Sequence, residues 1–130
     1  MITVTASKPT VRQTFADYTF SGADGAPITE PIRVQYYSFT TKRLKELRNE
    51  VKAKLDAGEA LWHSDSLADQ LHGLPDLVDE KKRPCFVPHE GDEKKRAKAI
   101  AFLDTLDVGN IDSIKKAIDE DVSPKEQPNK

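Results

Sequence analysis

Residues 32–47, IRVQYYSFTTKRLKEL, contain the point at which the spacing of the hydrophobic side chains changes. Before that point, from Ile32 to Tyr36, apolar residues alternate with polar ones, which is typical of a half-buried β-strand. After it, Thr40 or Thr41 offers an N-terminal cap for a helix with a hydrophobic period of three to four. The apolar face of this helix consists of Leu44, Leu47, Val51 and Leu55. The change of period predicts a strand followed by a helix, and hence an α+β fold.

A second run with strand character precedes this stretch. Aromatic residues from Phe15 to Phe20 lie among threonines, and residues 21–27, SGADGAP, combine glycines with a proline. We therefore expect a β-hairpin with a rather long loop. Residues 1–10 are a candidate edge strand, which Pro9 limits in length.

The chain after the first helix alternates between helical and irregular segments. A short second helix is expected with Ser64 or Ser66 as its cap and Gly73 as its end, and Trp62 is expected to pack beneath it. A third helix is expected to begin at Asp92. Their apolar faces consist of Leu67 and Leu71 in the second helix, and of Ala99, Phe102, Leu103 and Leu106 in the third.

A last helix is expected after Gly109, with Asn110 as its cap and apolar residues at spacings of three and four. Residues 76–91 have charge, proline and glycine without an apolar period, so they are interpreted as an irregular loop. Residues 123–130 are expected to be a disordered polar tail. The prediction is a single α+β domain over residues 1–122, in which an N-terminal antiparallel hairpin or small sheet packs with three or four helices.

Composition narrows the class of protein. The 130 residues are 37% hydrophobic and 32% charged, which predicts one modest core with a heavily solvated surface. The formal charge of −2, with both signs mixed along the chain, gives no electrostatic reason to expect nucleic acid as a partner. No apolar stretch approaches the roughly 20 residues that cross a bilayer, so no membrane partner is expected. The single cysteine is compatible with a reducing cytoplasm, and folding is expected to rest on packing alone.

The side chains most able to carry chemistry are His63, His72, Cys85 and His89. Zinc sites usually take ligands in pairs from tight turns, but only Cys85 and His89 are close in sequence. A cysteine nucleophile needs a fixed base, which a proline-rich loop is a poor place to hold. The adjacent carboxylates of residues 119–121 point around a helix and do not converge. We therefore expect no catalytic activity, no metal and no cofactor, and we expect Cys85 and the histidines to be dispensable.

Several segments together have the pattern of a known family. They are DGAPITEP (24–31) before the strand IRVQY (32–36), the helix opened by Thr40-Thr41, LADQL (67–71), VDEKKRP (78–84), and the ending IKKAIDEDVSP (114–124) before a polar tail. In this order of features the chain resembles the small tail assembly chaperones of siphophages, the long-tailed bacteriophages. It departs from them at Lys82-Arg83-Pro84, where such chains often have Gly-Lys-Pro, and in the basic insert at residues 91–98.

The resemblance implies a non-catalytic protein of the host cytoplasm that is absent from the mature virion. Such a chaperone coats the tape-measure protein and helps to recruit tail tube subunits around it. The alternative is a structural tail or virion component that uses the same elements as a permanent interface between proteins.

The first helix also predicts a binding surface. Between Lys42 and Lys54 it carries six basic residues against Glu46 and Glu50. A solvated helix face is the simplest interpretation, and a positive surface for an acidic partner segment is the other. We expect the protein to self-associate or to bind a long amphipathic helix through aromatic anchors, helix leucines and a basic face that steers the partner. The residues expected to form this surface are Tyr36, Tyr37, Phe39, Leu44, Lys45, Leu47, Arg48 and Lys52.

Overall fold

The computed structural model describes residues 10–60 and 62–122. Within these residues the elements follow in the order β1 (Thr10–Ser21), β2 (Pro27–Ser38), α1 (Thr41–Asp56), α2 (His63–Gln70), β3 (Leu71–Gly73), α3 (Glu93–Asp104) and α4 (Val108–Val122). The fold is α+β, with a small antiparallel sheet and helices, as the sequence predicts. The candidate edge strand of residues 1–10, except for Thr10, and the expected tail of residues 123–130 lie outside the described residues.

The sheet is built around a long hairpin. Strands β1 and β2 pair antiparallel from Thr10 opposite Ser38 to Ser21 opposite Pro27, and β3 adds to the other side of β2. The hairpin loop closes with a hydrogen bond from the backbone N–H of Gly22 to the carbonyl of Ala26, 2.8 Å long. Gly25 within this loop has a φ of +83°, a conformation that only glycine adopts without strain. The glycines that predicted the loop are therefore used as expected.

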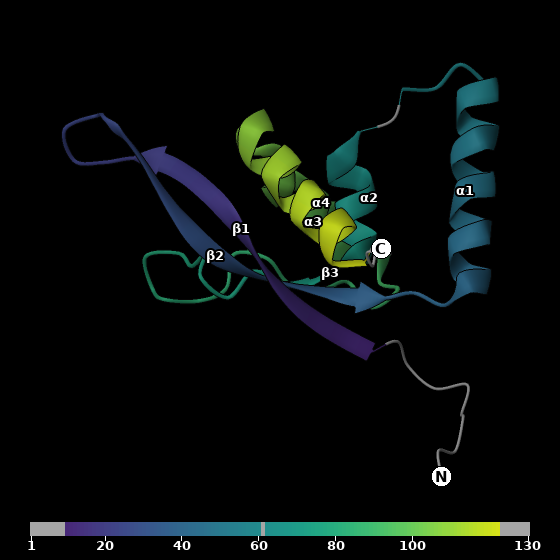
Figure 1. The fold of residues 1–130 in the computed structure, drawn as a ribbon, viewed down its shortest axis with the longest axis horizontal. Coiled ribbons are helices and arrows are strands. Elements are labelled where there is room, and N and C mark those ends of the chain that lie inside the picture. Colours follow the sequence, from purple (N-terminus) through teal and green to yellow (C-terminus); the bar gives the residue numbers. More distant parts are fainter. Residues whose placement is uncertain (1–9, 61, 123–130) are drawn as a thin grey trace, which may run out of the picture.

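One face of the sheet carries the core. Directly paired residues of antiparallel strands share a face, so Ala16 and Ile32 lie together, as do Thr14 and Val34. Helices α2, α3 and α4 pack over the same face, on the upper side of the hairpin in Figure 1. The buried apolar residues that form this core are Ala16, Ile32, Val34, Tyr36, Leu67, Ala68, Leu71, Leu74, Phe86, Ala99, Leu103, Ile111, Ile114 and Ile118.

The chain at the end of α2 differs from the sequence prediction. The second helix was expected to continue to Gly73, but it ends at Gln70, and residues 71–73 form β3. There Leu71 pairs with Tyr36 and Gly73 with Gln35, so β3 occupies the edge of β2 that β1 does not use. Residues 71–73 could not make these pairs if α2 continued to Gly73. A Cβ at Gly73 would lie 2.8 Å from the side-chain oxygen of Gln35, so a larger residue there would require the Gln35 side chain to move.

Two further expectations at helix starts are wrong. Trp62 does not pack beneath α2: it is 67% exposed. Asn110 does not cap α4, because that helix begins at Val108. The buried Asn110 amide instead donates from Nδ2 to the carbonyl of Thr19 and accepts at Oδ1 from the N–H of Thr19, both at 2.9 Å. This two-way contact fastens α4 to strand β1.

The segment between β3 and α3 contains no helix, and its strand pairing is limited to one isolated bridge from Val78 to Pro84. It is nevertheless anchored. Phe86 and Leu74 are buried in the core, and Asp76 accepts hydrogen bonds from the backbone and guanidinium of Arg33. The irregular backbone is thus held against the sheet by side chains at several points.

A carboxylate joins this segment to two helices. Asp69 of α2 accepts from Nε and Nη2 of Arg96 in α3, at 2.8 and 3.0 Å. Nε2 of His89 lies 2.8 Å from the same carboxylate, while Nδ1 of His89 accepts from the N–H of Gly91. Burial alone would raise the pKa of Asp69, but the hydrogen bonds from Arg96 and His89 outweigh it and leave that pKa lowered.

Candidate protein-binding surface

Helix α1 stands apart from the rest of the fold. None of its residues is buried, and the packing between elements that builds the core does not involve it. In Figure 1 it lies at one side of the molecule, joined to the body only through its two ends. A helix in this position gains little from tertiary packing, so its stability depends on local interactions.

Those local interactions are present. The side-chain oxygen of Thr40 accepts from the N–H of Arg43 at 3.1 Å, which confirms the expected cap. The Arg43 guanidinium lies 3.4 Å from Glu46 and 3.3 Å from Glu50. At the other end Gly58 takes a φ of +79°, the left-handed conformation that commonly terminates helices. The sequence therefore forms this helix without support from a core.

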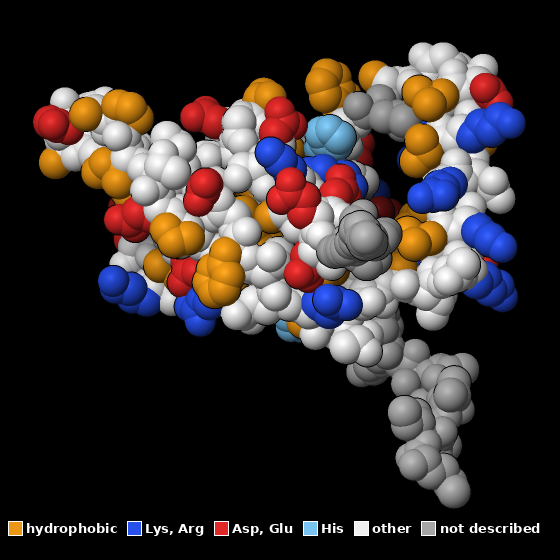
Figure 2. Space-filling view, in the orientation of Figure 1, with side chains coloured by type: hydrophobic (Ala, Val, Ile, Leu, Met, Phe, Trp, Pro, Cys, Tyr) orange, Lys and Arg blue, Asp and Glu red, His pale blue; other side chains and the backbone are white. Residues whose placement is uncertain are grey.

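The apolar stripe of α1 is open to solvent. Leu44 is 36% exposed, Val51 43% and Leu55 57%, and Leu47 is half-buried. A row of leucine and valine at helical spacing normally lies against a core, because each such side chain gains roughly 1.5–3 kcal/mol on full burial. Figure 2 shows hydrophobic side chains on the side of α1 toward the body of the molecule, and basic side chains on its outer side. Among the described residues, this stripe is therefore an apolar surface that is largely uncovered.

The charge of α1 contrasts with that of the remaining chain. The helix carries six basic and three acidic side chains, a formal charge of +3, within a protein of charge −2. All three residues of the predicted steering face, Lys45, Arg48 and Lys52, are exposed. This exposure leaves them accessible to an acidic partner.

The aromatic part of the predicted surface needs one correction. Tyr36 is fully buried, and its hydroxyl donates a hydrogen bond to the carboxylate of Asp121 at the end of α4. Alternation along β2 places it on the core face, so it is not accessible to a partner. Tyr37 lies on the opposite face, half-buried, with its hydroxyl 3.2 Å from Nδ1 of His72. Phe39 is half-buried in the link to α1.

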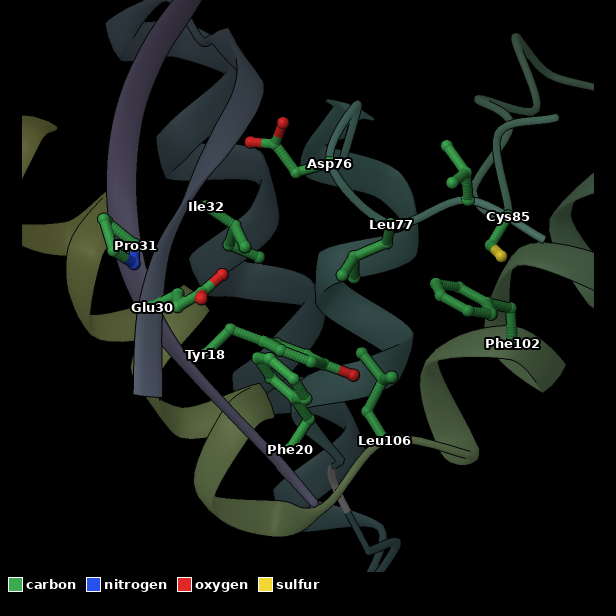
Figure 3. A pocket seen from close by; sticks show the side chains of 11 residues that line it. Tyr18, Phe20, Glu30, Pro31, Ile32, Asp76, Leu77, Cys85, Phe102 and Leu106 are labelled. Carbon is green, nitrogen blue, oxygen red and sulfur yellow. The ribbon is translucent and has the colours of Figure 1, made fainter. Parts of the chain in front are cut away.

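A cavity of about 580 Å³ opens on another part of the molecule, between the distal half of the hairpin, the irregular segment and α3. Figure 3 shows the rings of Tyr18 and Phe20 side by side on one wall, with Cys85 and Phe102 opposite them. Burial, followed by the charges of Asp107 and Cys85, raises the pKa of Tyr18. The residues that line the cavity are Tyr18, Phe20, Glu30, Pro31, Ile32, Asp76, Leu77, Val78, Cys85, Phe102 and Leu106.

The polar candidates of the sequence lie in different places. Cys85 lines the cavity, His89 pairs with Asp69, and His72 contacts Tyr37. In the part of the chain that the structure describes, no three histidine, cysteine or acidic side chains are grouped so as to hold a metal ion. Sequence reasoning missed the Asp69 network and the contact between Asn110 and Thr19, because neither has a local spacing that would reveal it.

Comparisons with known proteins add no family assignment: no protein-family model matches the chain, and no significant match was found among curated proteins or among solved structures. Across residues 10–60 and 62–122, no helix is long and apolar enough to span a bilayer.

Proposed function

We propose that the protein is a non-catalytic binding protein that holds an acidic amphipathic helix of a partner against α1. The observation that carries the proposal is the solvent exposure of Leu44, Val51 and Leu55 in the apolar stripe of α1, a helix with no buried residue. An amphipathic helix whose apolar side chains are left largely exposed by the described residues offers a surface on which a second amphipathic helix can dock.

The partner's charge follows from that of α1. The formal charge of +3 on α1 favours a partner segment that has acidic residues beside its own apolar stripe. The basic side chains Lys45, Arg48 and Lys52 would raise the association rate, and salt would weaken this effect. The leucines would control dissociation, because apolar burial is insensitive to moderate salt.

Within this class, we assign the protein the role of a siphophage tail assembly chaperone. The order of features over residues 24–130 supports the role, as does the exposed helix α1, since a tape-measure protein is a long helical chain on which such a helix can dock. In this role the protein coats the tape-measure protein and recruits tail tube subunits. If it were instead a structural tail component, purified particles would contain it; a chaperone is absent from them.

A synthetic peptide tests the binding chemistry directly. The peptide has leucine at the core positions of three heptads and glutamate beside them, and its control has lysine in place of every glutamate. We expect the acidic peptide to bind, and the lysine peptide to bind at least about tenfold more weakly. Fluorescence anisotropy at several salt concentrations measures both. Equal binding of the two peptides would remove the electrostatic part of the proposal.

Charge reversal locates the site. The triple variant Lys45→Glu, Arg48→Glu and Lys52→Glu should weaken binding of the acidic peptide and slow its association. The matched control reverses Lys94, Lys95 and Lys98, three exposed lysines of α3, and so changes the net charge equally. The control should bind nearly as the parent does. If both triples lose affinity to the same degree, net charge and not α1 governs binding.

A further inference from the structure

Strand β1 is the edge strand of the described sheet, and only part of its outer edge is covered. The sheet order is β1-β2-β3, so β2 pairs with one side of β1 and leaves the other side open. Helix α4 covers the far end of that open side. There Asn110 bonds both backbone groups of Thr19, and the Ser113 hydroxyl donates to the carbonyl of Asp17 at 2.7 Å.

The alternation of a strand extends this observation along β1. Since the backbone groups of Thr19 and Asp17 point outward, those of Phe15, Gln13 and Val11 point outward too. In the described residues, no hydrogen bond joins these three backbones to any group on the open side. An edge of this kind pairs readily with another extended chain unless something blunts it. Here α4 blunts residues 17–19 and leaves residues 10–16 open.

On the face of the sheet away from the helices, the open stretch carries two exposed apolar side chains. Phe15 is 60% exposed and Val11 43%, and both lie on the face of the sheet away from the helices. Gln13 lies between them, with its side-chain oxygen 3.2 Å from the amide nitrogen of Gln35. Within residues 10–60 and 62–122, nothing pairs with the outward backbone groups of this stretch or packs over its two exposed apolar side chains.

We infer that this edge pairs with the same edge of a second copy of the protein, antiparallel and with its two-fold axis at Gln13. The occupant is a second copy because the pattern is self-complementary. With Gln13 opposite Gln13, Phe15 of each copy lies opposite Val11 of the other, so each exposed apolar side chain gains an apolar cross-strand neighbour. On the other face Arg12 lies opposite Thr14, so no like charges meet.

In this register Thr10 lies opposite Ala16, and the pairing stops at Asp17, where α4 begins to cover β1. Each of the three outward-facing pairs exchanges two backbone hydrogen bonds, and the two sheets become one continuous sheet. The interface is short, which makes the dimer weak and concentration-dependent. This inference does not rest on the function proposed for α1.

A charge exchange at the axis tests both the pairing and its register. Gln13→Glu places two carboxylates opposite each other, and Gln13→Lys places two ammonium groups there, so each variant alone should be monomeric. A mixture of equal amounts should form a dimer again, because opposite charges then meet. Sedimentation equilibrium over a concentration series measures the mass, with circular dichroism to verify the fold of each variant.

The matched control is Gln35→Glu, because it removes the same side-chain hydrogen bond from a residue of the central strand. It should dimerise as the parent does. Nuclear Overhauser contacts between Phe15 of a labelled copy and Val11 of an unlabelled copy would report the register directly. A parent protein that is monomeric at the highest concentration, or a mixture that stays monomeric, overturns the inference, as does a Gln13→Glu variant that dimerises unchanged.

Discussion

The Nε2 atom of His89 lies 2.8 Å from a carboxylate oxygen of Asp69, and this pair ties the irregular segment to helix α2. Nδ1 of His89 accepts a hydrogen bond from the N–H of Gly91, so the neutral ring carries its proton on Nε2. This Nε2–H donates a hydrogen bond to the carboxylate of Asp69. The same carboxylate holds Arg96 of α3. One acidic side chain thus joins three parts of the chain that are distant in sequence.

Acid should weaken the fold partly through Asp69. Its pKa is lowered in the folded protein, so the folded state binds fewer protons than the unfolded state in the acid range. The stabilisation is fully present above the ordinary aspartate pKa of about 3.9 and is lost as the pH falls through the lowered folded value. Asp69→Asn should therefore be less stable than the parent at neutral pH by about 1–2 kcal/mol, a figure kept small because the side chain is partly exposed. Urea unfolding from pH 6 to about pH 2 should show that the free energy of unfolding depends less steeply on pH in the variant than in the parent.

His89 should matter for stability, contrary to the expectation from sequence that all three histidines are dispensable. His89→Ala removes the bond to Asp69 and the acceptor for Gly91, and should cost about 1–2 kcal/mol of unfolding free energy. His63→Ala is the matched control, since His63 is exposed at the start of α2, and it should cost less than about 0.5 kcal/mol. Equal stability of the two variants in chemical denaturation would restore the original expectation.

Removal of the Asn110 amide should lower the free energy of unfolding more than removal of most other polar side chains. Asn110→Ala leaves the N–H and the carbonyl of Thr19 without their protein partner in a partly buried place, at a cost of about 1–3 kcal/mol. Asp112→Ala changes an exposed neighbour on the same helix and should stay within about 0.5 kcal/mol of the parent. Thermal and urea unfolding of both variants measure the difference.

The leucines of α1 should be nearly silent for folding. Leu55→Ala removes a side chain that is 57% exposed and should cost less than about 1 kcal/mol. Leu103→Ala removes a fully buried side chain of α3 and should cost about 2–5 kcal/mol. If Leu55→Ala proved as costly as Leu103→Ala, α1 would have to pack against the body of the protein in solution.

Alkaline titration should distinguish Tyr36 from an exposed tyrosine. Burial, with the hydrogen bond to Asp121 and its charge, raises the pKa of Tyr36 to about 12, while Arg12 acts in the opposite direction. Because the folded pKa lies above the unfolded one near 10, the stabilisation holds below about pH 10 and is lost as the pH rises toward 12. Ultraviolet titration of the parent should show a late phenolate step that Tyr36→Phe lacks.

The sequence by itself determined the types of most elements. Alternation in residues 32–36 and the three-to-four spacing after Thr40 depend only on which side chains recur along one chain segment, so the hairpin and α1 could be predicted locally. The cap at Thr40 and the loop with Gly25 have the same local origin. The residues of the basic face were also predictable, because a charged side chain is exposed by default.

Only the tertiary structure decided which apolar faces are covered. The spacing of Leu44 to Leu55 is that of a core helix, yet this stripe is open, whereas the similar stripe of Ile114 and Ile118 is buried. Strand β3 forms because β2 has a free edge with which it can pair. Asn110 does not cap α4, and its side chain instead bonds the backbone of Thr19, 91 residues earlier in the chain. Hydrophobic period is a local property, but burial depends on which distant segment arrives at that surface, and no local spacing contains that information.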